Sequence, residues 1–192
     1  MKGLTVCQPW ADAIAFLGKR VENRTWLTRY RGPLILQAGK SLSHMTPEAL
    51  AFIRAATGRP FVGRVFLGSA LAIVRVRGAF TLSGFRQNGL DKAFGVEKWL
   101  EGPNALWFGE PLVLRTPVPM RGAQGLFDVP ADIVAAVALA VDPPRANGVE
   151  CRWCGCTEKE ACWDPRTGVG CHWVSKGVCS ACAEFERAVE QA

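Results

Sequence analysis

The chain has 192 residues, of which 49% are hydrophobic and 21% charged, so it has enough apolar material for a core and is not a disordered chain. Its formal charge of +6 favours an anionic partner. This excess lies in residues 1–142, which hold 17 basic and 10 acidic residues, whereas residues 143–192 hold 6 and 7. Seven of the eight cysteines lie at the other end, between Cys151 and Cys182.

The sequence gives no sign of export or of a membrane span. Gln8, Pro9 and Asp12 interrupt the N-terminal apolar stretch, which a secretory signal would keep continuous. The longest apolar run, residues 133–141, is far shorter than the roughly 20 residues that a membrane span requires. We therefore expect a cytoplasmic protein without a membrane partner, in which clustered cysteines bind metal rather than form disulfides.

Local signals predict strands and helices in mixed order. Pro9 suits the first turn of a helix and Gly18 the position after its end, while Thr46, Pro47 and Glu48 form a second helix start. Because the strands are scattered among few helices without regular alternation, the pattern favours an α+β or barrel-like domain. The predicted strands cover residues 3–7, 34–38, 62–77 and 112–116, and the predicted helices cover residues 9–17, 46–56 and a segment starting at 130.

A linker separates two predicted domains. Residues 142–148 read DPPRANG, and two prolines and a glycine neither continue a helix nor pair in a sheet. We predict a first domain over residues 1–142, a linker over 143–149 and a cysteine-rich module over 150–192.

Residues 8–40 combine basic, aromatic and base-reading side chains. Cations hold phosphates, aromatic rings stack on bases, and a carboxylate or an amide reads a base edge, so the set is coherent for RNA, another nucleic acid or a nucleotide. The alternative is a solvated loop with two structural tryptophans. The segment contains Lys19, Arg20, Arg24, Arg29, Arg31 and Lys40, with Trp10, Trp26 and Tyr30 between them and Glu22 and Asn23 in the middle.

The order of these residues resembles the ASCH domain. The resemblance rests on QPWA at 8–11, GKRVENRTW at 18–26 and RYRGPLILQAGK at 29–40, and it continues over about residues 2–135. Lys19 and Glu22 match the Lys-x-x-Glu core of the family's hallmark, Gly-x-Lys-x-x-Glu. In this chain the glycine, Gly18, stands directly before the lysine, without the intervening residue. The resemblance implies an α+β fold: a PUA-like β-barrel with flanking helices, and a ligand cleft beside the first helix. It also implies RNA or nucleotide binding, or hydrolysis of RNA or of N4-acylated cytidine.

We assign hypothetical roles to eight residues of this predicted cleft. Lys19, Arg24 and Arg31 hold phosphate, Trp10 or Trp26 stacks on a base, and Glu22 accepts hydrogen bonds from an amine or a ribose hydroxyl. For Glu22 the alternative is a salt bridge with Arg24 or Arg31 that only shapes the loop. Lys19 and Glu22 are also the catalytic candidates. The full ligand-binding set is Gln8, Trp10, Lys19, Glu22, Asn23, Arg24, Trp26 and Arg31.

The hydrolase alternative lacks residues that the family uses. In the acylcytidine hydrolases a nucleophilic threonine follows the lysine by three residues, where this chain has Glu22. The partner glutamate should lie within residues 49–90, which contain no Asp or Glu. A metal-independent nuclease would instead use Lys19, Tyr30 and His44, with the histidine as the general base.

The cysteines of the C-terminal module are spaced as metal ligands. Cys151 and Cys154 form one CxxC pair and Cys179 and Cys182 a second, and two such pairs complete a tetrahedral site for Zn²⁺. The module is too short to form a core alone, so the metal would supply its folding energy as in a zinc ribbon.

The remaining ligand-type residues leave alternatives open. Cys162 and Cys171 are second-tier ligands, and with Cys156 and His172 they would form a second zinc site; an iron–sulfur cluster is a further alternative. The module would otherwise serve as a docking site for a protein partner. Cys7, alone on the first predicted strand, is expected to be a small buried residue.

Overall fold

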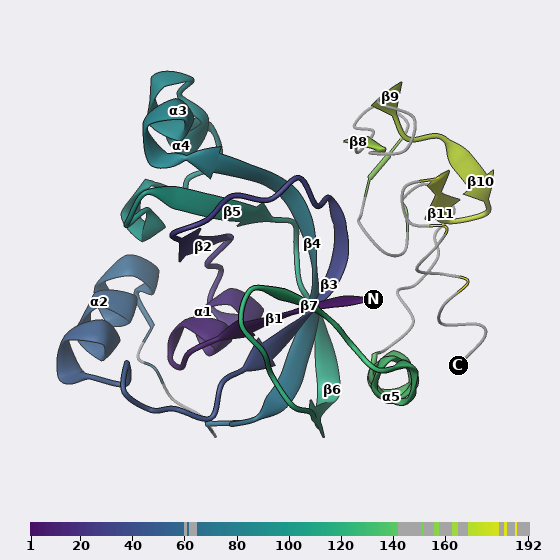
Figure 1. Cartoon of the computed structure of the whole chain (residues 1–192). Coiled ribbons are helices and arrows are strands. Elements are labelled where there is room, and N and C mark those ends of the chain that lie inside the picture. Colours follow the sequence, from purple (N-terminus) through teal and green to yellow (C-terminus); the bar gives the residue numbers. More distant parts are fainter. Residues whose placement is uncertain are drawn as a thin grey trace.

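The structure is a computed structural model, shown in Figure 1. It describes residues 1–59, 61, 65–141, 151, 156–157, 163–164, 169–180, 183 and 187. The predicted linker, residues 143–149, lies outside the described residues, so the domain boundary stays a prediction.

Helices and strands alternate irregularly along the first domain, as expected for an α+β fold. The helices are α1 (Trp10–Phe16), α2 (Pro47–Thr57), α3 (Leu82–Gln87), α4 (Leu90–Ala93), the 3₁₀ turn η1 (Glu97–Trp99) and α5 (Ala131–Ala140). The strands of the first domain are β1 (Lys2–Val6), β2 (Val21–Arg24), β3 (Gly32–Ala38), β4 (Ser69–Thr81), β5 (Asn104–Phe108), β6 (Leu112–Pro119) and β7 (Leu126–Asp128). The C-terminal module adds β8 (Trp163–Asp164), β9 (Val169–Gly170), β10 (Trp173–Ser175) and β11 (Val178–Cys179).

One seven-stranded sheet forms the centre of the first domain, in the order β2-β5-β4-β3-β1-β7. β4 has two neighbours along one of its edges. β6 pairs with the first half of β4, and β5 pairs with the second half of β4. The register shifts where β4 meets β5, between Val76 and Gly78. Gly78 suits this bulge because a Cβ there would lie 2.2 Å from the Phe80 ring.

The predicted β-barrel does not close among the described residues. Closure requires the first and last strands of the order to pair, and no described ladder joins β2 to β7. Both of these strands are short, with four and three residues. The fold is therefore a mixed α+β structure built on an open sheet.

The two faces of the sheet bury separate apolar clusters because side chains alternate along each strand. Leu34, Leu36 and Val74 face the cluster that contains α1, whereas Ile35 and Ile73 face the cluster that contains α5. Figure 1 shows α1 and α2 on one side of β3 and β4, and α5 on the other. A third cluster packs α1 and α2 against the segment from α3 to η1. This last packing determines where the cavity described below can form.

Most predicted elements lie close to observed ones, but strands β2, β5 and β7 were not predicted. The strand predicted from residue 62 starts at Ser69, and the stretch from α3 to η1 contains helices that no sequence signal predicted. The module contains the two-stranded pairs β8–β9 and β10–β11, which do not by themselves establish a zinc ribbon. No helix in the described part of the chain has the length and apolar character that crossing a membrane requires.

Candidate ligand cleft and cysteine cluster

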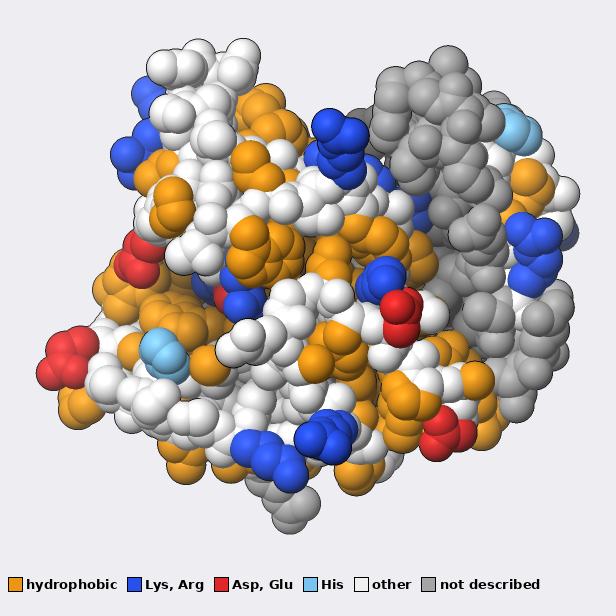
Figure 2. Space-filling view, in the orientation of Figure 1, with side chains coloured by type: hydrophobic (Ala, Val, Ile, Leu, Met, Phe, Trp, Pro, Cys, Tyr) orange, Lys and Arg blue, Asp and Glu red, His pale blue; other side chains and the backbone are white. Residues whose placement is uncertain are grey.

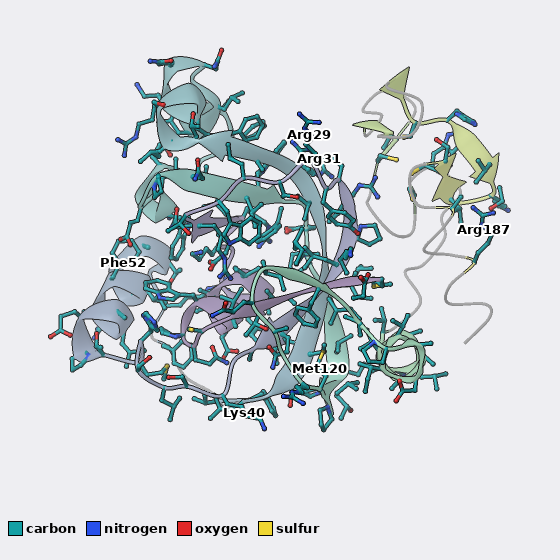
Figure 3. The ribbon with its side chains drawn as sticks, viewed as in Figure 1. Arg29, Arg31, Lys40, Phe52, Met120 and Arg187 are labelled. Carbon is teal, nitrogen blue, oxygen red and sulfur yellow. The ribbon has the colours of Figure 1, made fainter. Side chains whose placement is uncertain are left out.

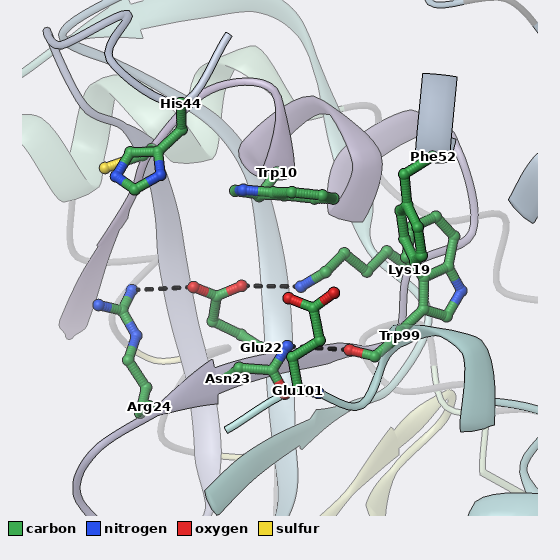
Figure 4. Close-up of a pocket in the computed structure, with 10 residues that line it drawn as sticks. Trp10, Lys19, Glu22, Asn23, Arg24, His44, Phe52, Trp99 and Glu101 are labelled. Atoms are coloured by element: carbon green, nitrogen blue, oxygen red, sulfur yellow. Dashed lines mark hydrogen bonds and ion pairs between the residues drawn. The ribbon is translucent and has the colours of Figure 1, made fainter. Parts of the chain in front are cut away.

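A cavity of about 330 Å³ opens beside α1 and contains much of the predicted site. Figure 2 shows a hollowed face on which hydrophobic side chains surround a few basic and acidic atoms, and Figure 4 shows the lining side chains. The described lining residues are Cys7, Trp10, Lys19, Glu22, Asn23, Arg24, His44, Phe52, Trp99 and Glu101. Five of the eight predicted ligand-binding residues are therefore brought together: Trp10, Lys19, Glu22, Asn23 and Arg24.

An ion-pair network forms the floor of the cavity. Lys19 Nζ lies 2.8 Å from Glu22 Oε2, and Arg24 Nη2 lies 3.3 Å from Glu22 Oε1. Lys19 also donates to the Val21 carbonyl, and Arg24 Nη2 donates to the Thr5 carbonyl at 2.6 Å. Lys19 and Glu22 are both buried, so each charge depends on the other for compensation. The alternative predicted for Glu22, a salt bridge with Arg24 or Arg31, is thus observed with Arg24, and both residues of the pair line the cavity.

Aromatic rings form the walls. Trp10 meets Phe52 edge-on with ring centroids 6.0 Å apart, and Phe52 meets Trp99 at 5.7 Å in the same manner. Lys19 Nζ lies 5.9 Å from the centre of the Trp10 ring, a distance at which a cation is attracted to the ring face. The cavity therefore offers flat apolar surfaces next to paired charges.

Asn23 fastens one wall of the cavity to β2. Its side-chain amide donates to the Trp99 carbonyl at 2.9 Å, and its side-chain oxygen accepts from the Glu101 backbone amide at 3.0 Å. The two ends of the side chain thus bond the last residue of η1 and the segment that follows it. This places the ring of Trp99 and the carboxylate of Glu101 at the cavity.

Unpartnered polar atoms gather next to Arg24. Among the described residues, the buried atoms without a hydrogen-bond partner are Thr5 Oγ1, Arg24 Nε and Gln37 Oε1. Thr5 and Gln37 are register partners on β1 and β3, and Arg24 bonds the Thr5 carbonyl. A Cβ on Gly122 would lie 2.4 Å from both Thr5 Oγ1 and Gln37 Oε1, so this backbone covers them. Buried polar atoms are normally hydrogen-bonded, so these three atoms are exceptions.

Three predicted ligand-binding residues do not line the cavity. Gln8 is fully buried at the start of α1, where its side-chain amide donates to Asp12 Oδ1 at 2.6 Å. Trp26 packs against the core cluster around α1. Arg31 donates to the carbonyls of Thr28 and Tyr30, and Figure 3 shows it beside Arg29, well apart from Phe52. The structure gives these three residues local structural contacts.

Burial of Asp12 perturbs its protonation. Desolvation raises the pKa of the Asp12 carboxyl, and the hydrogen bond from Gln8 lowers it to a smaller extent. The Asp12 backbone amide also donates to Gln8 Oε1, at 3.2 Å. The Gln8–Asp12 pair therefore fixes the first turn of α1, from which Trp10 reaches the cavity.

The predicted nuclease set is only partly assembled. Lys19 and His44 both line the cavity, with His44 coming from the loop before α2. Tyr30 does not line it, because its hydroxyl donates to the Pro33 carbonyl and remains with β3. The imidazole thus has access to the cavity, but the tyrosine lies outside it.

Sequence reasoning missed four lining residues. Phe52, Trp99 and Glu101 lie far along the chain from the Lys-x-x-Glu segment, and no local pattern connected them with it. Cys7 was expected to be buried in the core, but it is only half-buried and lines the cavity. Its position one residue beyond β1, at the end of a strand next to α1, was the available signal.

Among the described cysteines of the C-terminal module, Cys156 joins one member of each predicted pair, Cys151 and Cys179. The sulfur atoms of Cys151, Cys156 and Cys179 all lie within 4.8 Å of one another, and the three residues are buried. Cys171 Sγ lies 3.5 Å from Cys156 Sγ. Cys154, Cys162 and Cys182 lie outside the described residues, so their predicted roles stay predictions. The three clustered thiols form a donor set that fits a metal ion.

Comparisons with known proteins give structural matches only. No protein-family model and no curated protein matches this sequence. The chain is similar in structure to the ASCH protein from Zymomonas mobilis, with a TM-score of 0.46 and 11% identity over 73% of this chain and 95% of that one. Structures of two point mutants of that Zymomonas mobilis protein match at a TM-score of 0.45 and 11% identity, over 73% of this chain and 96% and 98% of theirs.

Proposed function

We propose that the chain is an ASCH-type, PUA-like protein that binds RNA through a single nucleotide held in the cavity beside α1. The observation that carries the proposal is one cavity of about 330 Å³ in which aromatic rings stand next to two cations and two carboxylates. A nucleotide needs these groups: rings for the base, donors and acceptors for its edge, and cations for the phosphate.

In this proposal, different lining residues contact different parts of the nucleotide. Trp10 and Trp99 offer the flat surfaces, and Glu22 and Glu101 offer acceptors for an amine or a ribose hydroxyl. Arg24 is the less buried of the two cations, with a side chain 23% exposed, so it contacts the phosphate. Lys19 stays paired with Glu22 and orients that carboxylate.

Binding of fluorescently labelled single-stranded RNA, measured by anisotropy over a range of salt concentrations, tests the proposal. We expect binding to weaken log-linearly with salt, and free nucleoside monophosphates to compete with the RNA. Arg24→Gln should raise the Kd roughly tenfold or more, since a hydrogen bond to a charged group contributes about 1.5–3 kcal/mol.

Arg29→Gln is the matched control because it removes the same charge from an exposed residue outside the cavity. It should change the Kd only through the general electrostatic attraction. If both variants weaken binding equally, or if neither single-stranded RNA nor nucleotides bind at low salt, the cavity is not the binding site. Duplex DNA is measured beside the RNA to establish strandedness.

A second candidate function is hydrolysis of RNA or of N4-acylated cytidine in the same cavity. The specific observation in its favour is that a thiol and an imidazole, those of Cys7 and His44, both line the cavity. A thiol can act as a nucleophile and an imidazole as a base. Turnover of N4-acetylcytidine or of RNA by the protein, lost in Cys7→Ser or His44→Ala, would make the chain an enzyme; absence of turnover would leave binding as its function.

In this proposal the cysteine-rich module binds Zn²⁺, and the ion stabilises it. The support is the cluster of three buried cysteine sulfurs, because thiolates are the usual ligands of structural zinc. Metal analysis of the purified chain, followed by thermal unfolding with and without a chelator, tests this part. An unchanged melting curve after complete metal removal would contradict a stabilising role.

A further inference from the structure

Three cysteine sulfurs of the C-terminal module lie close enough to share one ion, and a fourth sulfur lies beside one of them. Cys151, Cys156 and Cys179 are 2%, 4% and 1% exposed, and their sulfurs lie within 4.8 Å of one another. Cys171 Sγ lies 3.5 Å from Cys156 Sγ. Tetrahedral coordination with Zn–S bonds of about 2.3 Å places the sulfurs roughly 3.8 Å apart. The three clustered sulfurs lie within about 1 Å of this separation, and Cys171 Sγ has it to Cys156 Sγ, so a small approach of Cys171 to the other two sulfurs would complete a tetrathiolate site.

The backbone brings these sulfurs together from three separate turns of chain. The Cys151 amide donates to the Cys156 carbonyl at 2.8 Å, which closes the first loop. The hairpin of β10 and β11 pairs Trp173 with Cys179, and the Ser180 amide donates to the His172 carbonyl at 2.7 Å. These bonds hold the chain around Cys171 and Cys179 at the same end of the hairpin.

The surroundings of the sulfurs favour thiolates bound to a cation. The Cys179 amide points at Cys151 Sγ at 3.5 Å, and an amide donor stabilises a negatively charged sulfur. Val178 is buried in the same cluster, and the partly buried Trp173 packs against it. Thiolates of the three buried cysteines need a compensating positive charge, because burying an isolated charge is costly.

We propose that Cys151, Cys156, Cys171 and Cys179 together bind one Zn²⁺ ion. This inference rests on the proposed zinc binding and specifies its ligands. The set differs from the two CxxC pairs expected from spacing: it contains Cys156 and Cys171, whereas Cys154 and Cys182 lie outside the described residues.

Metal content of the full-length chain and of Cys→Ser variants tests the ligand set. Cys156→Ser and Cys171→Ser should lose the same ion that Cys151→Ser and Cys179→Ser lose, whether the native chain holds one ion or two. Cys7→Ser is the control because its thiol lies in the first domain, and it should keep the full metal content. The proposal is overturned if Cys156→Ser and Cys171→Ser keep all their metal while Cys154→Ser and Cys182→Ser lose it.

A second variant covers the case in which a serine substitution prevents folding. In the Co²⁺-substituted protein, Cys171→His should retain the ion with a weaker thiolate-to-metal charge-transfer band, because one sulfur ligand becomes nitrogen. An unchanged Co²⁺ spectrum would show that Cys171 is not a ligand and would overturn the proposed set. A native chain that contains no metal would instead refute zinc binding itself, which separates the two failures.

Discussion

Glu22→Gln removes one charge from the Lys19–Glu22–Arg24 network and keeps the shape of the side chain. Lys19 Nζ and Glu22 Oε2 are 2.8 Å apart, and the two side chains are 3% and 11% exposed. At this distance and an effective dielectric constant of about 20, their attraction is about 6 kcal/mol, much of which offsets their desolvation. The variant leaves Lys19 charged and buried beside a neutral amide.

We expect Glu22→Gln to lower the free energy of unfolding by about 3 kcal/mol, near the lower end for a broken buried pair, because Lys19 keeps the Val21 carbonyl as an acceptor. For a chain of this size that loss corresponds to a fall in Tm of about 6–12 °C. Urea denaturation followed by circular dichroism, together with thermal melts, provides the measurement. Lys19→Met/Glu22→Gln should recover part of the loss, because it leaves no unpaired lysine.

Asp128→Asn is the matched control. Lys2 Nζ lies 2.8 Å from Asp128 Oδ1, the same separation as in the buried pair, but the Asp128 side chain is 83% exposed. Solvent screens such a pair, so no resolvable change in the urea midpoint is expected. If Glu22→Gln and Asp128→Asn had the same effect, burial would not be what makes the cavity pair important, and the reasoning would be refuted.

Three further substitutions test the local structure. Asp12→Asn should become more stable relative to the native chain as the pH rises above about 4. The raised pKa of the Asp12 carboxyl gives the native chain stability at low pH that is lost as the pH rises through the folded-state pKa. Urea midpoints at several pH values measure this, and a difference between the two chains that does not change with pH would contradict it. Gly78→Ala should destabilise by about 1–3 kcal/mol because its Cβ meets the Phe80 ring, and an unchanged Tm would contradict this. Thr46→Ala should cost about 1 kcal/mol, seen as a lower urea midpoint, because its hydroxyl accepts from the Ala49 amide at the start of α2.

Elements with local signals were predictable from the sequence. The capping hydroxyl of Thr46 and the following proline predicted α2, and Pro9 and Gly18 bounded α1. The helices between Leu82 and Trp99 have no such signals, and their stability comes from burying residues such as Phe85 in the third cluster. Sheet closure was also not predictable, because it depends on pairing between strands at opposite ends of the sheet order.

The candidate site also contains some residues that local sequence signals predict and others that only long-range packing brings together. Lys19 and Glu22 are three residues apart, so their pairing follows from the local chain. Phe52 and Trp99 reach the cavity only through the packing of α2 and η1, which no spacing reveals. In the module, CxxC spacing indicated Cys151 and Cys179 as candidate metal ligands. Cys156 joins them through a backbone hydrogen bond and a hairpin, and the geometry of these cannot be predicted from the spacing of the cysteines.

The strand that carries Glu22 and Arg24 is the end member of the sheet, with β5 as its neighbour in the order. Terminal strands of a sheet open locally more readily than central ones, so amide hydrogens on β2 should exchange faster than those on β4. Lys19 counteracts this by holding the Val21 carbonyl with its ammonium group. The proposed ligand-binding residues Glu22 and Arg24 therefore lie on a part of the sheet that a bound ligand would stabilise. Protection of residues 21–24 from exchange would then report binding even where global stability barely changes.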